Sequence, residues 1–243
     1  MKHILYTIVC SMVILFASCT KNDVLASTDE AGYLSLQNVE KISPIVSTVT
    51  SRADANTQAD DLTVEIWQGE KRLYQLSEAE VNVKVKLDAG DYELKVYSSN
   101  YGNESDWTND DKGAPVYYKE QSFSIKAGET CFLTVKVPML VYAVQLTLPE
   151  SFGEWFPTYT FTVTSDTRAV TLKAGETAYF SYNSGTTFAY KLIMQNTDGE
   201  EQSKEGTYGT DPVVQQGHLY DVNYSLANQT LSAFGDLVLR IAR

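Results

Sequence analysis

Residues 81–96, VNVKVKLDAGDYELKV, carry the pattern that decides the fold. Apolar side chains occupy every second position up to Leu87 and again from Tyr92 to Val96, with polar residues between them. A period of two places one set of side chains on a core and the other in water, as in an antiparallel β-strand. The intervening Asp88-Ala89-Gly90-Asp91 is typical of a tight turn, because Gly and Asp accept the backbone angles that turns need. The stretch therefore predicts two strands joined by a turn.

The same alternation recurs along most of the chain. Apart from a helical turn expected at residues 150–155, no segment shows the 3.6-residue period of an amphipathic helix. Many short strands separated by turns indicate an all-β sandwich or barrel. The other segments with period-two alternation are 33–39, 62–66, 159–163, 190–194, 220–226 and 237–241.

An internal repeat indicates how the strands are grouped. FSIKAGETCFLTV (residues 123–135) parallels VTLKAGETAYFSY (residues 170–182), and both predict a strand, a tight turn and a second strand. We expect two consecutive antiparallel β-sandwich domains, residues 32–138 and 139–243. The strand register resets near Pro138, and each half has about 100 residues, the usual size of a sandwich. One intertwined sandwich that uses the same hairpin twice is the alternative.

The N-terminus has the features of a bacterial lipoprotein signal. A basic start precedes an apolar run from Ile4 to Ala17, shorter than the roughly 20 residues of a membrane-spanning helix. Phe16-Ala17-Ser18-Cys19 resembles a lipobox, although lipoproteins prefer Leu where Phe16 stands. We predict a signal peptide at residues 1–18, lipidation of Cys19 and a polar tether at residues 19–31. An ordinary signal peptide with a chance cysteine is the alternative.

Charge and cysteine content narrow the range of functions. The formal net charge of −12 would make nucleic acids and anionic headgroups repel the chain, which excludes nucleic-acid binding. Of three cysteines, Cys10 leaves with the signal peptide and Cys19 takes the lipid, so Cys131 has no disulfide partner. Because Cys131 alternates in phase with Leu133 and Val135, we predict a small buried side chain.

The sequence offers little support for catalysis. It lacks the common catalytic motifs, and the mature chain holds a single histidine, His218, so we predict a non-enzymatic protein without a cofactor. The acidic stretch 104–113 offers oxygen ligands but lacks the spacing of a calcium-binding loop. We therefore predict a solvated loop there and no metal site.

Glycan binding is the main alternative function, because the chain has 16 Tyr and 3 Trp. Aromatic rings stack on the C–H faces of sugars while neighbouring polar groups bind hydroxyls. A glycan site would require at least two exposed tryptophans on one face. The candidate contacts are Trp67, Trp107, Trp155 and Tyr101.

A set of short motifs in a characteristic order resembles a known family. The motifs are the lipobox, Gly32–Leu36, Ser51-Arg52-Ala53-Asp54, Asp61–Ile66, Leu87–Leu94 and Ala114–Tyr118. Together they resemble a Bacteroidales surface lipoprotein domain of unknown function, allied to the fimbrillin-like adhesins, over roughly residues 32–226. The resemblance implies fimbrillin- or transthyretin-like sandwich domains on an outer-membrane, surface-exposed lipoprotein.

The resemblance also implies a mode of assembly. In fimbrillins an Arg-Ala bond in such a stretch is cut by an Arg-specific protease, and a strand from one subunit completes the next. Arg52-Ala53 matches that site by residue type, although Arg52 follows the first strand. An uncut flexible loop is the alternative.

The last predicted strand can be interpreted in two ways. Residues 234–243 alternate to the end of the chain and either complete their own sheet or add to the edge of another subunit. We expect a structural or interaction module of fimbrial or cell-adhesion type, with a glycan-binding lipoprotein as the alternative. Its expected partners are the membrane, through the lipid on Cys19, another copy or fimbrial subunit and, in the alternative, a glycan.

Overall fold

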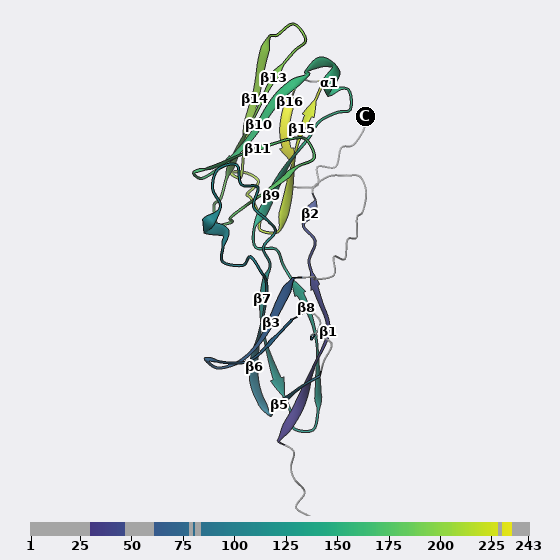
Figure 1. Ribbon diagram of the computed structural model, residues 1–243, viewed down its shortest axis with the longest axis vertical. Helices are drawn as coiled ribbons and strands as arrows, with labels where there is room; N and C mark the ends of the chain where they lie inside the picture. The colour runs from purple at the N-terminus through teal and green to yellow at the C-terminus, as the bar shows by residue number, and fades with distance from the viewer. Residues whose placement is uncertain (1–29, 47–60, 78–79, 81–83, 228–229, 235–243) are drawn as a thin grey trace, which may run out of the picture.

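The computed structural model describes residues 30–46, 61–77, 80, 84–227 and 230–234 (Figure 1). These residues form four β-sheets, so the all-β prediction is confirmed. Figure 1 shows two sandwich-like halves along the long axis of the molecule, with β1, β3 and β8 in one and β9 to β16 in the other. Among the described residues, no helix is both long enough and apolar enough to cross a membrane.

The first half packs two sheets around one core. The β4-β3-β6-β7 sheet is antiparallel. The β5-β1-β8 sheet is mixed, because β1 pairs antiparallel with β5 and parallel with β8. The strands are β1 (Ala31–Lys41), β3 (Leu62–Gln68), β4 (Lys71–Leu76), β5 (Val85–Asp88), β6 (Gly90–Ser98), β7 (Tyr118–Ile125) and β8 (Thr130–Val137), and a 3₁₀ turn, η2 (Glu104–Asp106), follows β6.

The second half repeats this two-sheet arrangement. The β11-β10-β13-β14 sheet is antiparallel, whereas in the β12-β9-β15-β16 sheet β15 runs parallel to β9. The two-residue strand β2 also pairs with β15, so the segment after β1 reaches into the second half. The elements are β2 (Ile45–Val46), β9 (Tyr142–Thr147), α1 (Phe152–Trp155), β10 (Thr158–Ser165), β11 (Arg168–Leu172), β12 (Thr177–Phe180), β13 (Phe188–Gln195), β14 (Glu201–Tyr208), β15 (His218–Ser225) and β16 (Thr230–Phe234).

Each half has its own hydrophobic core, built by the alternation that the sequence shows. Leu34, Val64 and Leu94 from three strands of the first half are fully buried. Tyr142 and Phe161 are fully buried in the second half. The division of the chain into domains 32–138 and 139–243 stays a prediction.

The prediction that all strands pair antiparallel is wrong for two of the four sheets. The β1–β8, β2–β15 and β9–β15 pairs are parallel. Parallel neighbours need a long connection, and here the chain between β1 and β8 builds the whole opposite sheet. Alternation of apolar residues is the same in both kinds of pair, so it does not distinguish them.

The repeated KAGE stretches are corners between sheets and not hairpins. The first joins β7 to β8 and the second joins β11 to β12, and each pair of strands belongs to two different sheets. In both turns the glycine, Gly128 or Gly175, has a left-handed φ, of 73° or 80°. Its amide donates to Ala31 O of β1 in the first half and to Leu146 O of β9 in the second half. The repeat therefore marks one structural solution used once in each half.

Candidate functional site

The outer side of the β4-β3-β6-β7 sheet carries four aromatic rings, which we call the aromatic face. Trp67, Tyr97 and Tyr118 occupy strand positions that point away from the core, and Tyr101 comes from the turn after β6. The ring of Tyr101 stacks on Tyr118 with a centroid distance of 4.6 Å and lies 5.8 Å from Tyr97. Tyr101 is the most exposed of them, at 41%. The face therefore presents a stacked cluster of tyrosines at one end and a tryptophan at the other.

The carboxylate of Glu65 holds the two ends of the aromatic face together. It accepts hydrogen bonds from Trp67 Nε1 at 2.8 Å, Arg72 Nη1 at 2.6 Å and the Tyr97 hydroxyl at 3.0 Å. Glu65 is only 5% exposed. Burial acts to raise the pKa of its carboxyl, but the three hydrogen bonds outweigh burial and lower that pKa. Glu65 is therefore ionised and fixes the rings of Trp67 and Tyr97.

Charged side chains lie between the two ends of the face. Lys95 Nζ lies 5.2 Å from the centroid of the Trp67 ring, 3.3 Å from Glu120 Oε1 and 3.6 Å from Glu93 Oε2. The Tyr118 hydroxyl donates to Glu120 Oε2 at 2.9 Å. Burial, followed by this bond to Glu120, raises the pKa of Tyr118 to about 12. The face thus offers hydrogen-bonding groups beside its rings.

The structure brings two of the four predicted glycan contacts together and separates the others. Trp67 and Tyr101 lie on the aromatic face. Trp107 is half-buried beneath the guanidinium of Arg168, whose Cζ lies 5.1 Å from its ring centroid. Trp155 is 63% exposed on α1, in the other half of the molecule. The condition of two exposed tryptophans on one face is therefore not met, while Tyr97 and Tyr118, which the sequence analysis did not single out, join the face.

The acidic stretch 104–113, in the first half, contacts β11 of the second half, and we call this set of contacts the clamp. Arg168, at the start of β11, donates to the backbone oxygens of Thr108, Tyr179 and Asp111. The Asp110 amide donates to Ala169 O at 2.9 Å. Within the described part of the chain, no three His, Cys, Asp or Glu side chains gather as metal ligands. The loop therefore contacts protein on one side and is not simply solvated.

Further residues named in the sequence analysis either pack into the fold or lie outside the described residues. Cys131 is half-buried against the first core, and this burial raises the pKa of its thiol. His218 is buried at the start of β15. Cys19 and Arg52 lie outside the described residues, so lipidation and proteolytic processing stay predictions.

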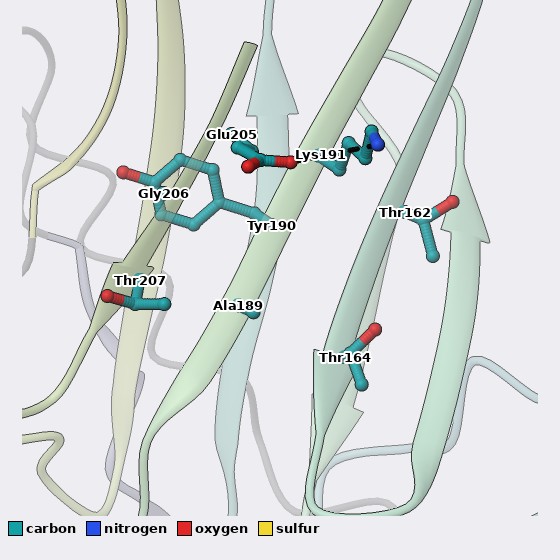
Figure 2. A pocket seen from close by; sticks show the side chains of 8 residues that line it. All are labelled: Thr162, Thr164, Ala189, Tyr190, Lys191, Glu205, Gly206 and Thr207. Atoms are coloured by element: carbon teal, nitrogen blue, oxygen red, sulfur yellow. Dashed lines mark ion pairs between the residues drawn. The ribbon is translucent and has the colours of Figure 1, made fainter. Parts of the chain in front are cut away.

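A hollow of about 620 Å³ lies on the outer side of the β11-β10-β13-β14 sheet (Figure 2). Thr162 and Thr164 line one side of it, and the ion pair between Lys191 and Glu205, at 3.7 Å, lies across from them. The small side chain of Ala189 leaves room between these groups (Figure 2). The surface that lines the hollow is part polar and part apolar, and nothing in it selects one ligand chemistry.

The strand β1 fills a slot between β5 and β8, which we call the β1 slot. It pairs with β8 from Tyr33 to Lys41 and with β5 from Ala31 to Leu34. Its side chains Leu34 and Leu36 are buried in the first core at 0% and 4% exposure. An N-terminal strand thus supplies the middle of a sheet.

The narrowest point of the slot lies at Gly32. A Cβ atom on this residue would lie 2.3 Å from Lys126 O, 2.7 Å from Glu129 O and 2.8 Å from Ile125 Cγ2. Only glycine fits there without a backbone shift, because two of the three atoms belong to the main chain of the corner between β7 and β8.

These features define an all-β protein whose candidate sites, among the described residues, are the aromatic face and the β1 slot. Residues 30–241 match the model of a family described as Domain of unknown function (DUF4493). The chain belongs to that family, as the resemblance in the sequence implied. None of the curated proteins matches it at a significant level.

Solved structures from Bacteroides species are similar to the chain at low sequence identity. A candidate adhesin from Bacteroides ovatus has 14% identity and a TM-score of 0.41 over 89% of this chain and 97% of its own. A candidate polysaccharide-binding protein from Bacteroides thetaiotaomicron has 8% identity and a TM-score of 0.45 over 83% and 93%. A candidate cell adhesion protein from Bacteroides uniformis has 10% identity and a TM-score of 0.42 over 73% and 90%.

Proposed function

We propose that the protein is a non-enzymatic, lipid-anchored interaction module of fimbrial or cell-adhesion type, in which the C-terminal segment of one copy takes the β1 slot of the next. One observation carries this proposal. Gly32-Tyr33-Leu34-Ser35-Leu36 of β1 has the pattern Gly-x-Leu-x-Leu, and Gly235-Asp236-Leu237-Val238-Leu239, directly after β16, has the same pattern. A strand addition of this kind obtains affinity from main-chain hydrogen bonds and specificity from alternate side chains.

The glycine in this pattern matters because of the narrow point of the slot. With the two patterns aligned, Gly235 takes the place of Gly32, where any Cβ atom would clash with the backbone of the corner. Leu237 and Leu239 take the places of the two buried leucines of β1. The C-terminal segment therefore carries the residue types that this slot requires, in the required order.

The match continues beyond the leucines. β1 has a one-residue register shift after Leu36, and Val39 then pairs with Val135. A strand without that bulge would place the residue two positions after the second leucine opposite Val135. In the C-terminal segment that residue is Ile241. An unbulged strand from another copy would thus fill the same apolar positions.

Length and charge also favour the exchange. The segment 235–243 has nine residues and spans about 30 Å when extended, enough to run along the slot. It contains Arg240 and Arg243 in a chain with a formal net charge of −12. Attraction between this basic segment and an acidic second copy would speed their encounter.

The slot becomes available when the chain is cut between β1 and β3. Arg52-Ala53 lies between β2 and β3 in the sequence, so cleavage there would free β1 and β2 from the rest of the chain. Burial of each of the two leucines of β1 contributes about 1.5–3 kcal/mol, so an empty slot is costly. A second copy's segment restores that burial and makes the exchange favourable.

The proposed location of the uncut protein is the outer membrane, exposed at the cell surface. After a cut at Arg52 the lipid on Cys19 stays with the fragment that carries β1, and strand exchange then holds the remainder in the assembly. The apolar run and the lipobox-like Cys19 in the sequence support a lipid anchor. Cells grown with labelled palmitate are expected to label the wild-type protein but not Cys19→Ser. Surface proteolysis of whole cells is expected to reach the protein, and protection of it would contradict the surface location.

Assembly is tested with residues 20–243 carrying a viral protease site inserted after Arg52. Size-exclusion chromatography with light scattering is expected to show multimers after cutting and monomers before it. The matched control is the same cut protein ending at Phe234, which keeps β16 but lacks the Gly-x-Leu-x-Leu segment. This control is expected to stay monomeric, and multimers in it would overturn the proposed exchange.

A further inference from the structure

We propose that the aromatic face binds a neutral oligosaccharide or polysaccharide, with Tyr101 and Trp67 as its two stacking rings; the exposed ring of Tyr101 takes the place of the second tryptophan that the sequence analysis required. The site lies on the β4-β3-β6-β7 sheet, whereas the β1 slot belongs to the β5-β1-β8 sheet. Ligand binding and strand exchange are therefore separate properties, and the failure of one leaves the other intact. Sugar rings present apolar C–H faces and hydroxyl rims, which aromatic rings with polar neighbours recognise.

The position of Tyr101 is the first argument for a ligand. Cross-strand pairing explains rings that sit on strands, such as Tyr97 and Tyr118, which are register partners. Tyr101 is in a turn and is stacked on top of Tyr118 at an interplanar angle of 13°. It remains 41% exposed, so one ring face is held outward from the sheet. Such a ring adds little to sheet pairing and is well placed for stacking.

The spacing of the rings indicates the size of the ligand. Trp67 pairs with Glu93, and Tyr97 lies four residues further along β6. At the rise of an antiparallel strand these backbone positions lie about 13 Å apart, while Trp67 Nε1 and the Tyr97 hydroxyl converge on the one carboxylate of Glu65. The ring of Tyr101 extends the face, with its centroid 5.8 Å from that of Tyr97, so we expect a ligand that stacks on both Trp67 and Tyr101 to have at least two linked sugars.

The face is held in place before any ligand arrives. Glu65 binds Trp67 Nε1 and the Tyr97 hydroxyl together, and Glu120 binds the Tyr118 hydroxyl. Because these rings are already ordered, binding would cost less side-chain entropy than on a flexible surface. The hydrogen bonds therefore prepare the face for a rigid, extended ligand.

Charge selects neutral over anionic glycans. Glu65, Glu93 and Glu120 outnumber Arg72 and Lys95 on this face, and the whole chain has a formal net charge of −12. An anionic polysaccharide would meet repulsion both locally and over the molecule. The side chains of Glu93, Glu120 and Arg72 are 37%, 40% and 49% exposed, so their polar atoms can exchange hydrogen bonds with neutral hydroxyls.

The test is affinity electrophoresis of residues 20–243 in gels containing xylan, mannan, starch, mixed-linkage β-glucan, heparin or alginate. At least one neutral polysaccharide is expected to retard the wild type, and heparin and alginate are not. Tyr101→Ala is expected to weaken the retardation at least about tenfold. Trp155→Ala is the matched control, because it removes an aromatic ring that is 63% exposed but lies in the second half, and it is expected to leave retardation unchanged.

Each result decides the proposal. Migration unaffected by all four neutral polysaccharides overturns it, as does equal retardation of the wild type and Tyr101→Ala. Stronger retardation by heparin than by any neutral polymer overturns the assignment of ligand charge. Circular dichroism of both variants confirms that they are folded, and Tyr101→Phe, which keeps the ring, is expected to retain retardation.

Discussion

Replacement of Gly32 by alanine tests the fit of β1 in its slot. The new Cβ atom would meet Lys126 O at 2.3 Å and Glu129 O at 2.7 Å. Both belong to the corner that is hydrogen-bonded to β1 through Tyr33 N to Glu129 O and Gly128 N to Ala31 O, each at 2.9 Å. Overpacking costs about 1–3 kcal/mol, and loss of the two hydrogen bonds costs about 1 kcal/mol each. Alanine regains about 0.5–1 kcal/mol over glycine, so the expected loss of unfolding free energy is about 2–4 kcal/mol.

The assay for Gly32→Ala is urea unfolding followed by tryptophan fluorescence, with Gly153→Ala as the matched control. No heavy atom lies within 4 Å of a Cβ atom at Gly153, and its φ is not left-handed. Because Gly153 lies in α1, the control is expected to be as stable as the wild type or more stable by up to about 1 kcal/mol. If Gly32→Ala is equally harmless, the slot does not require glycine, and the Gly-x-Leu-x-Leu match no longer supports strand exchange.

Three further predictions concern the clamp, Glu65 and the free thiol. Arg168→Ala removes three hydrogen bonds to backbone carbonyls and is expected to lower the free energy of unfolding in urea by about 2–4 kcal/mol. The control Lys191→Ala, which removes an exposed ion pair, should lower it by less than about 0.5 kcal/mol. Equal effects of the two substitutions would contradict the role of Arg168 in the clamp. Because the pKa of Glu65 is lowered on folding, its ionisation stabilises the protein above its unfolded pKa, and this stability is lost as pH falls through the folded pKa. Glu65→Gln should therefore flatten the decline of the urea midpoint between about pH 6 and pH 3, and an unchanged decline would refute the assignment. Burial raises the pKa of Cys131, so iodoacetamide should alkylate it much more slowly in the folded protein than in urea. Phe132→Cys in a Cys131→Ser background, at a position 59% exposed, should react quickly, and equal rates would contradict the burial.

The sequence predicts the strands well because alternation is a local property. Leu62–Ile66 and Tyr92–Val96 lie in β3 and β6 with their apolar residues inward, and the helical turn at residues 150–155 is α1. Pairing partners are not local. The β1 sequence is compatible with either direction of pairing, and only the path of the chain through the opposite sheet makes it parallel to β8.

In the candidate sites, too, local features were predictable from the sequence and long-range contacts were not. Trp67 follows the alternation of its strand and points away from the core, as the period of two predicts. Trp107 lies in the stretch 104–113, for which we predicted a solvated loop, yet Arg168, far along the chain, covers its ring. Tyr118 gave no signal of its own, because its role depends on a turn residue that folds back over it. Sequence alternation indicates which way a side chain points but not which distant segment it meets.

Strand exchange through the C-terminal segment is tested most directly with a fluorescent peptide of residues 233–243. The peptide is added in excess to residues 20–234 that have been cut at a protease site after Arg52, and its anisotropy is followed while released residues 20–52 are measured by mass spectrometry. The proposed exchange predicts that the peptide binds and that the N-terminal fragment is displaced. It also predicts that a peptide with alanine in place of Gly235 does neither. Binding of both peptides alike, or binding to uncut protein as strongly as to cut protein, would contradict the exchange.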